Sequence, residues 1–301
     1  MDWTSKDTIE VIYRLLAVKG VGTVQSNRML FAVQNKVGTA GELEHTIRGQ
    51  LTEEQQRQFD NFYSLRQRTP DVSYMAIPAP QYPQILITLL RQNTPTVLSC
   101  MGNLSLLQKA KVGFSGSRKA SEKGLWIARD CASQLAEQDI CVVSGYAGGV
   151  DIAAHRAALQ SGGSTIIVLP EGIDAFHVKE EIKSDWDWER VLVVSEFMPH
   201  DVWMASRAMH RNNTIIALSD SMLVVEAGDT GGSLDAGIKT LNMGKSLYVP
   251  CFAQVPESAK GNPVLLSRGA RAMMQKRHTS RVNVDEMVGS LGRMRKQVLA
   301  I

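Results

Sequence analysis

The pattern of apolar positions changes near residue 111. Before about residue 70, apolar residues recur three or four positions apart, as in Ile9, Ile12 and Leu16, and this spacing predicts amphipathic helices. From residue 111 onward, runs that are apolar throughout alternate with helix-patterned segments; the runs are 111–116, 140–145, 164–170, 191–197, 221–228 and 246–252. Such strands are typical of a parallel sheet covered by helices on both faces. The sequence therefore predicts an α/β protein with a Rossmann-like, doubly wound, mostly parallel sheet, preceded by a small helical domain.

Four segments follow from this change of pattern. We predict a helical domain over residues 1–70, a Pro-containing connector with the start of an extended Rossmann domain over 71–110, a Rossmann-like domain over 111–275 and a short basic tail over 276–301. Proline disrupts the interior of a regular helix, so the prolines between 78 and 83 predict an extended link between the domains.

The first two predicted helices are separated by a glycine turn. Gly20 and Gly22 can form a tight hairpin, and Thr23 or Ser26 can cap the helix that follows. A helix, a glycine turn and a second helix form a helix-hairpin-helix, whose backbone amides can bind a nucleic-acid phosphate. Because this pattern is short, plain helix packing is the favoured interpretation, and DNA contact is the alternative.

Composition narrows the class of protein. The 301 residues are 44% hydrophobic and 21% charged, which is ordinary for a globular protein and excludes disordered, collagen-like and coiled-coil chains. No apolar run reaches the roughly 18 residues of a membrane span. The first residues carry charges where a signal peptide needs an apolar stretch. We therefore expect a cytoplasmic protein with no membrane partner.

The four cysteines are dispersed and form no C-x-x-C pair. Cys141 and Cys251 lie in or beside apolar runs, where a reduced cysteine behaves as a small hydrophobic residue. We expect buried thiols rather than a disulfide, and no metal or cofactor site.

Basic residues concentrate toward the end of the chain. The formal net charge of +3 by itself indicates no partner, but after residue 259 only Asp285 and Glu286 oppose the basic residues. These are Lys260, Arg268, Arg271, Lys276, Arg277, Arg281, Arg293, Arg295 and Lys296. Such a block suits a polyanion, although a solvated tail explains it about as well.

The first predicted strand of the parallel sheet ends in Gly116-Ser117-Arg118. Ligands of such sheets bind beyond the carboxyl ends of the strands, so the residues that follow each strand are the candidate site. Glycine lets the backbone approach a phosphate, serine can donate to its oxygens and arginine can pair with it. A capped tight turn with a surface arginine is the alternative, and we favour the phosphate site.

The second predicted strand ends in a glycine-rich turn that opens a helix. Ser144, Gly145 and Gly148 combine small polar groups with a helix start, which favours anion binding. The turn is not the G-x-G-x-x-G of dinucleotide-binding proteins. Asp151 can simply cap its helix, and His155, without partners for a metal, is interpreted as a structural hydrogen-bonding residue.

Two further strand ends and one helix start carry candidate residues for binding a base or a phosphate. Gly172 follows the third strand, with Phe176 to stack on a base and Lys179 to pair with a phosphate, although Phe176 is equally compatible with a place in the core. A helix begins near Arg211 and Asn212, which places a cation where a phosphate can lie. The last candidates are Thr230, Gly231, Gly232 and Ser233. Four phosphate-friendly turns on one sheet edge predict a ligand that carries phosphate.

Taken together, these motifs resemble the DprA/Smf family of DNA-processing proteins. The resemblance covers roughly residues 80–270 and rests on Gln81-Tyr82-Pro83, 95–98, Gly102, 116–118, 144–159, 165–174, Ser195-Glu196, 211–220, 224–240 and 261–270. It implies a helical SAM-like domain before an extended Rossmann domain. It also implies a recombination mediator, not an enzyme, that binds and protects single-stranded DNA and helps load a RecA-type recombinase, as in natural transformation. The family resemblance further implies a homodimer and DNA phosphate contact by Arg118.

The chain departs from the family pattern at three places. Asn213 stands where F-P-x-R-N-R has its last arginine, which weakens the transfer of phosphate contacts there. Phe176-His177-Val178 keeps the aromatic residue of the third-strand motif but not its tyrosine-proline pair. The residues after Arg271 are too few for the winged helix that many members carry.

Two other functions compete with the mediator. A nucleotide phosphoribohydrolase of the related LOG group needs a catalytic glutamate, but Gly237 and Ile238 stand near that position and Asp235 is the only nearby acid. The other candidate is a sensor of a free nucleotide, which would bind a mononucleotide well, whereas a DNA-binding protein would gain affinity with strand length.

Overall fold

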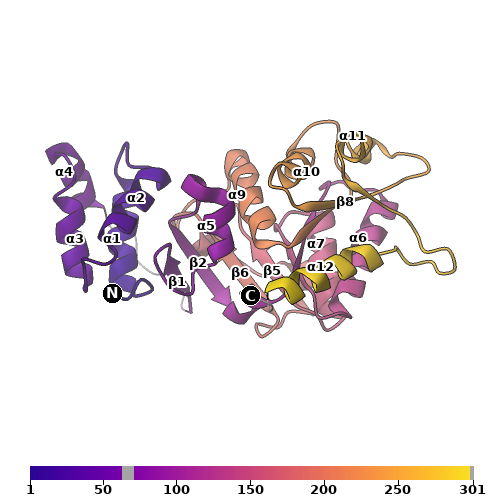
Figure 1. Ribbon diagram of the computed structural model, residues 1–301, viewed down its shortest axis with the longest axis horizontal. Helices are drawn as coiled ribbons and strands as arrows, with labels where there is room; N and C mark the ends of the chain where they lie inside the picture. The colour runs from indigo at the N-terminus through magenta and orange to yellow at the C-terminus, as the bar shows by residue number, and fades with distance from the viewer. Residues whose placement is uncertain (63–70, 299–301) are drawn as a thin grey trace. The chain divides into compact units, whose positions relative to one another are not determined.

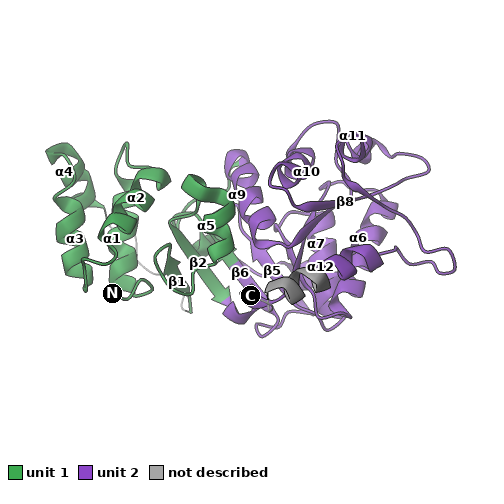
Figure 2. Cartoon of the chain, viewed as in Figure 1, with its two compact units in different colours: residues 1–101, 171–176, 194–204 green, residues 102–170, 177–193, 205–301 purple. Residues whose placement is uncertain are grey.

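The computed structural model describes residues 1–62 and 71–298 and, within the last helix, side chains as far as residue 291 (Figure 1). The chain forms two compact units (Figure 2). Unit 1 comprises residues 1–101, 171–176 and 194–204, and unit 2 comprises 102–170, 177–193 and 205–301. The predicted domain boundaries stay predictions, and parts of the first and last predicted segments, 63–70 and 299–301, lie outside the described residues.

Unit 1 combines the N-terminal helices with an antiparallel strand pair. Its elements are α1 (Lys6–Ala17), α2 (Thr23–Val33), α3 (Ala40–Arg48), α4 (Glu53–Asn61), β1 (Ser73–Ala76), α5 (Gln84–Leu90) and β2 (Val97–Gly102), which begins in this unit. Ser73 of β1 lies opposite Cys100 of β2. The buried Tyr13 of α1 shares a 2.9 Å hydrogen bond between its Oη and the Oγ of Ser99, which joins the helices to the strands.

The glycine turn between α1 and α2 forms as predicted. Gly20 has a φ of +83°, in the left-handed region that favours glycine. The predicted cap by Thr23 or Ser26 is wrong, because Gly22 is the N-cap, no side chain caps the helix, and Ser26 is buried.

The proline-rich connector is not extended throughout. Residues 84–90 form α5, and Pro83 stands at its N-cap. Proline disturbs a helix only where it removes an internal hydrogen bond, and it is tolerated at a helix start. The prediction of an extended link is therefore wrong for residues 84–90, which form α5.

Unit 2 is built on the strands of a mostly parallel sheet. They are β3 (Lys111–Ser115), β4 (Cys141–Ser144), β5 (Thr165–Val168), β6 (Val191–Ser195), which begins in this unit, β7 (Ser221–Val224), β8 (Ser246–Pro250) and β9 (Arg271–Met273). Their order is β6-β5-β4-β3-β7-β8-β9. The chain runs from β3 toward β6 and then returns to place β7 on the other side of β3, so the strand order reverses between β3 and β7. This α/β arrangement confirms the predicted Rossmann-like fold.

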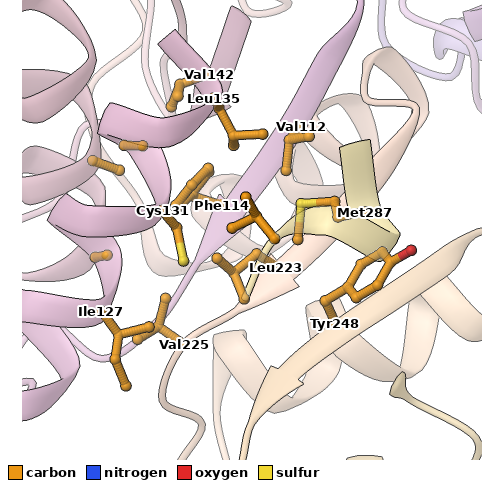
Figure 3. Close-up of a cluster of buried hydrophobic side chains, with 14 of the residues drawn as sticks. Val112, Phe114, Ile127, Cys131, Leu135, Val142, Leu223, Val225, Tyr248 and Met287 are labelled. Carbon is orange, nitrogen blue, oxygen red and sulfur yellow. The ribbon is translucent and has the colours of Figure 1, made fainter. Parts of the chain in front are cut away.

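Helices connect and cover these strands. They are α6 (Glu122–Ala136), α7 (Val150–Gln160), α8 (Glu180–Lys183), α9 (Ala205–Leu218), α10 (Gly232–Asn242), α11 (Asn262–Ser267) and α12 (Asp285–Val298). Val112 and Phe114 of β3, Leu223 of β7, Cys131 of α6 and Met287 of α12 meet in one buried cluster (Figure 3). Burial of this apolar surface orders the central strands, whose ends then carry the candidate site.

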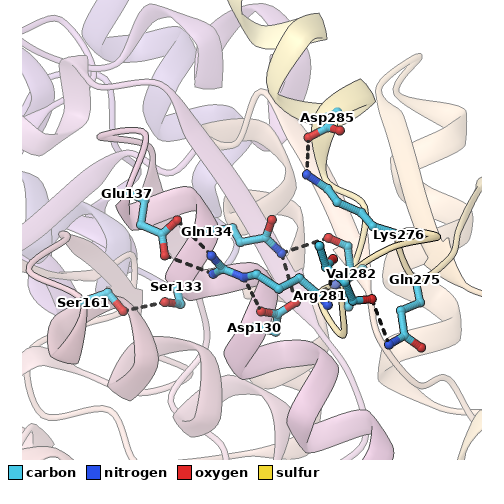
Figure 4. A network of polar contacts seen from close by, with 11 residues as sticks. Asp130, Ser133, Gln134, Glu137, Ser161, Gln275, Lys276, Arg281, Val282 and Asp285 are labelled. Atoms are coloured by element: carbon cyan, nitrogen blue, oxygen red, sulfur yellow. Dashed lines mark hydrogen bonds and ion pairs between the residues drawn. The ribbon is translucent and has the colours of Figure 1, made fainter.

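The C-terminal arm, residues 275–291, is anchored on α6. Arg281 contacts Asp130 at 3.0 Å and Glu137 at 3.0 Å, and the Val282 N–H donates to Asp130 at 2.6 Å (Figure 4). Met287 and Leu291 of α12 are buried. The arm is thus part of unit 2 rather than a solvated tail. Of the predicted basic block, the side chains of Arg293, Arg295 and Lys296 lie outside the described residues.

The cysteines divide into two environments. Cys100, Cys131 and Cys141 are buried as expected, and burial raises the pKa of the Cys141 thiol to about 12. The prediction is wrong for Cys251, which directly follows β8 and is exposed. Within residues 1–62 and 71–298, no helix combines the length and apolarity that crossing a membrane requires.

Candidate nucleic-acid interface

The first two glycine turns of unit 2 lie against each other. The Val150 N–H donates to the Ser117 carbonyl at 3.3 Å, which joins the start of α7 to the turn after β3. Gly149 has a φ of +75°, and a Cβ there would stand 2.3 Å from the Ser117 oxygen. A Cβ on Gly116 would stand 2.4 Å from Val150. Both positions therefore require glycine, because the turn after β3 and the start of α7 approach each other closely. Arg118 is exposed beside the start of a helix.

Arg211 lies directly beneath the turn after β4. The prediction that a helix begins near Arg211 is wrong, because α9 begins at Ala205 and Arg211 lies inside it. The arginine is buried, and a Cβ on Gly145 would stand 1.9 Å from its Nη1 atom. Asp151 is also buried and accepts a 3.3 Å hydrogen bond from the Ala147 N–H. Burial raises the pKa of Asp151, and the charge of Arg211 opposes that rise. The absence of a side chain at Gly145 therefore leaves room for the Arg211 guanidinium under the turn.

His155 supports the same turn from below. It is fully buried, with Nε2 2.5 Å from the Gly145 carbonyl and Nδ1 2.6 Å from Thr165 Oγ1. A carbonyl only accepts, so Nε2 carries the proton. Burial lowers the pKa of His155 to about 4, which keeps the ring neutral near pH 7. The structure confirms the interpretation of His155 as a structural hydrogen-bonding residue.

Lys179 contacts Tyr146, which belongs to the turn after β4. Its N–H donates to Tyr146 Oη at 2.8 Å, its Nζ donates to the Tyr146 carbonyl, and Nζ lies 4.4 Å from the centre of the ring. Sequence reasoning selected Lys179 but not Tyr146. An aromatic residue inside a glycine-rich turn is the signal that would have found it.

The turn before α10 adjoins the same helix that carries Arg211. Asn212 Nδ2 donates to the Gly232 carbonyl at 3.4 Å. Gly231 is the N-cap of α10 with a φ of +100°, and no side chain caps this helix. Thr230 and Gly231 are exposed and Ser233 is half-buried, so the start of α10 is accessible to an anion.

These contacts bring the predicted residues of unit 2 together at the carboxyl ends of the strands as one candidate site, which we call the strand-end site. It comprises Gly116, Ser117, Arg118, Ser144, Gly145, Gly148, Lys179, Arg211, Asn212, Thr230, Gly231, Gly232 and Ser233. It includes the point between β3 and β7 where the strand order reverses, the usual ligand position in this class of fold.

Gly172 and Phe176 belong to unit 1. The Gly172 N–H donates to the Asp201 carbonyl at 2.7 Å, and a Cβ on Gly172 would stand 2.2 Å from the Met198 carbonyl oxygen. Phe176 is half-buried, so it is not a fully buried core residue.

Glu226 is a buried polar residue that sequence reasoning did not select for the site. It accepts hydrogen bonds from the Ser121 N–H at 2.9 Å, Ser121 Oγ at 2.5 Å and Ser258 Oγ at 2.7 Å. Ser121 is the N-cap of α6, so Glu226 fixes the helix start that follows Arg118. Its place directly after an apolar strand was the available signal.

Comparison with known proteins now identifies the family. The family model for DNA recombination-mediator protein A matches residues 73–283, more than half of the chain. The chain belongs to the DprA family. This finding confirms the DprA/Smf resemblance and, at the level of the family, its description as a recombination mediator.

Individual relatives of the DprA family agree with this assignment. DNA processing protein DprA of Streptococcus pneumoniae is 33% identical over 60% of this chain and 64% of its own length. DprA of Bacillus subtilis is 26% identical over 68% of this chain and 69% of its own. Protein Smf of Escherichia coli is 34% identical, and the match spans 55% of this chain and 44% of that protein. The chain thus spans less than two thirds of some of its curated relatives.

Two solved DprA structures are similar to this one. The S. pneumoniae structure has a TM-score of 0.69 at 26% identity and covers 89% of this chain and 94% of that one. The second is a structure of DNA processing protein A of Helicobacter pylori that concerns its single-stranded DNA binding mode. It has a TM-score of 0.55 at 25% identity, and the match covers 68% of this chain and 89% of that one.

Proposed function

We propose that this DprA-family chain binds single-stranded DNA at the strand-end site. The observation that carries the proposal is the junction of Arg211 and Asn212 in α9, which contact the turns at Gly145 and Gly232 respectively. Cations, glycine backbone and helix starts converge there, and these groups bind phosphate without reading bases. A sugar-phosphate backbone that follows the site can therefore be held at successive phosphates.

The role in recombination follows from the family. We propose that the bound strand is protected and handed to a RecA-type recombinase in the cytoplasm, as in natural transformation, and that the protein acts as a homodimer. The DNA-binding mode of the H. pylori relative supports the strand as ligand. The recombinase and the second protomer rest on the family resemblance alone.

The proposal needs no catalytic step. At the start of α10, where a phosphoribohydrolase needs its glutamate, Asp235 pairs with Lys239 at 2.8 Å. Gly237 faces Leu265, whose Cδ2 would stand 2.6 Å from an added Cβ. An ion pair and an apolar contact thus occupy this part of α10, which favours a binding function.

The test is binding of fluorescent poly-dT of several lengths across a salt series. Affinity should increase with length and fall steeply with salt, because each neutralised phosphate releases counterions. Arg118→Ala should bind substantially less tightly, with a salt slope shallower by about 0.7–1. Arg129→Ala, which removes an exposed arginine of α6, is the matched control and should bind like the wild type.

Three results would overturn the proposal. The first is no binding at low salt, and the second is equal binding by Arg118→Ala and the wild type. The third is full affinity for a mononucleotide with no gain from length, which would assign the site to a nucleotide sensor. Hydrolysis of a nucleotide would instead support the enzyme.

A further inference from the structure

Helix α2 of unit 1 presents an exposed face that combines apolar and basic side chains. Val24, Arg28 and Phe31 follow one another at intervals of four and three positions, which places them side by side on a helix. Val24 and Phe31 expose 39% and 38% of their surface, and Arg28 is exposed as well. An aromatic ring thus stands next to an arginine on the outer face of α2.

The stretch of chain around α2 carries no acidic residue. Residues 11–41 contain four basic residues and neither aspartate nor glutamate. Three of the four, Lys19, Arg28 and Lys36, are exposed, and among the residues that the structure describes no carboxylate pairs with them. Because these cations precede, interrupt and follow the helix, positive charge extends along the whole of α2.

The carboxylates of α3, the next helix along the chain, are engaged elsewhere. Glu44 contacts Arg14, the fourth basic residue of the stretch, at 2.8 Å. Glu42 accepts a hydrogen bond from the Gly38 N–H at 2.6 Å. The charge on the outer face of α2 is therefore not balanced by its neighbour.

A further cation stands beside α2. Asn27 of α2 donates through Nδ2 to the Thr94 carbonyl at 2.7 Å, and Thr94 is the C-cap of the short 3-10 helix η1 (Arg91–Asn93). This bond joins η1 to α2, and Arg91 of η1 is exposed. The turn before α2 is held in the same unit, because the Lys19 N–H donates to Gln58 Oε1 at 2.9 Å.

We propose that this face binds a stretch of single-stranded DNA as a second site, separate from the strand-end site. We call it the α2 surface, and it comprises Lys19, Arg28, Phe31, Lys36 and Arg91. Cations beside an aromatic ring are what single-strand binding surfaces use, with cations for phosphates and the ring for a base. Charge along the length of a helix suits a ligand with a phosphate in every repeating unit. The α2 surface belongs wholly to unit 1, and the inference goes beyond the proposed function.

The test counts the strands that the full-length chain binds. Titration at low salt with a fluorescent dT oligomer of about 8 nucleotides, close to the length of one site, should give two strands per chain for the wild type. Arg28→Glu should reduce this number to one, because the reversed charge repels phosphate. Arg118→Ala should weaken the other site and leave binding at the α2 surface unchanged.

A second measurement tests the contact with a base. In the Arg118→Ala chain, Phe31→Ala should bind the dT oligomer about 10-fold more weakly, and it should bind an abasic oligomer of equal length without change. The salt slope should also stay the same, because no phosphate contact is lost. Phe31→Tyr should retain most of the affinity, since it keeps a ring that can stack.

Arg57→Ala is the matched control. Arg57 is an exposed arginine of α4 in the same unit, but it pairs with Glu54 at 2.7 Å, so its replacement should leave the number of strands and both affinities unchanged. Thermal unfolding of each variant verifies that the fold is intact.

Several outcomes would overturn the inference. They are one strand per wild-type chain, two strands for Arg28→Glu, or an equal loss by Phe31→Ala on the dT and abasic oligomers. Displacement of the oligomer from the Arg118→Ala chain by poly-glutamate as effectively as by poly-dT would assign the α2 surface to an acidic protein segment instead. If Arg118→Ala binds two strands with wild-type affinity, the strand-end proposal fails and the α2 surface stands.

Discussion

Unit 2 carries two groups of basic residues whose surroundings differ. At the strand-end site, Arg211 lies against the Gly145 backbone and its charge acts on the buried Asp151, while Lys179 lies against Tyr146. In the C-terminal arm, Lys276 pairs with Asp285 at 2.8 Å and Arg281 pairs with Asp130 and Glu137 (Figure 4). The arm has the denser basic sequence, but carboxylates of its own unit neutralise these two cations. The difference teaches that the local count of positive charge in the sequence does not show which cations are paired with carboxylates on the surface of the folded unit.

The largest effect is expected from Gly145→Ala. The added Cβ would stand 1.9 Å from Arg211 Nη1, so the buried guanidinium must move. Such overpacking costs about 1–3 kcal/mol, and the displaced turn should weaken poly-dT binding by about 10-fold or more. Chemical denaturation and the poly-dT assay measure the two effects.

Gly148→Ala is the matched control in the same turn, since nothing lies within 4 Å of its Cβ position. It should leave stability nearly unchanged and reduce affinity less than Gly145→Ala. Equal behaviour of the two variants would contradict the role given to the Gly145–Arg211 contact.

A smaller effect is expected from acidification. Burial lowers the pKa of His155 from 6.5 to about 4, so between these values the unfolded chain binds a proton that the folded chain does not. The contribution of His155 to stability is therefore complete above about pH 6.5 and decreases as the pH falls toward 4. The raised pKa of Asp151 acts in the opposite direction, because its contribution is lost as the pH rises through the folded-state value.

Replacement isolates the histidine contribution. His155→Gln should remove part of the loss of unfolding free energy between pH 6.5 and 4, measured by denaturation across that range. Glutamine Nε2 can still donate to the Gly145 carbonyl, so the turn should persist. An unchanged pH profile would show that the acid sensitivity arises elsewhere.

The smallest effect is expected from Arg281→Ala in the C-terminal arm. Arg281 is 39% exposed, so solvent screens its pairs with Asp130 and Glu137, and the loss of stability should not exceed about 1 kcal/mol. Poly-dT affinity and its salt slope should match the wild type. A loss as large as that of Arg118→Ala would mean that the arm also binds DNA, and the contrast between the two basic groups would break down.

Local patterns predicted individual elements well and their surroundings less well. The apolar runs located the parallel strands because a strand buried on both faces must be apolar throughout. The glycine turn between the first two helices was predicted correctly, but the predicted cap Ser26 is buried inside α2. Cys141 and Cys251 have similar apolar neighbours in the sequence, but only Cys141 is buried. Burial depends on packing partners that are distant in the chain.

The sequence by itself determined the Rossmann-like class, the glycine turns and the DprA/Smf resemblance, because each rests on residues close together in the chain. Only the tertiary structure decided which turns and helices contact one another. It placed Arg211 under Gly145, which lies 66 positions earlier in the chain. It also gave Lys276 and Arg281 carboxylate partners. Charge neutralisation and close backbone approach act through space, so spacing along the chain does not reveal them.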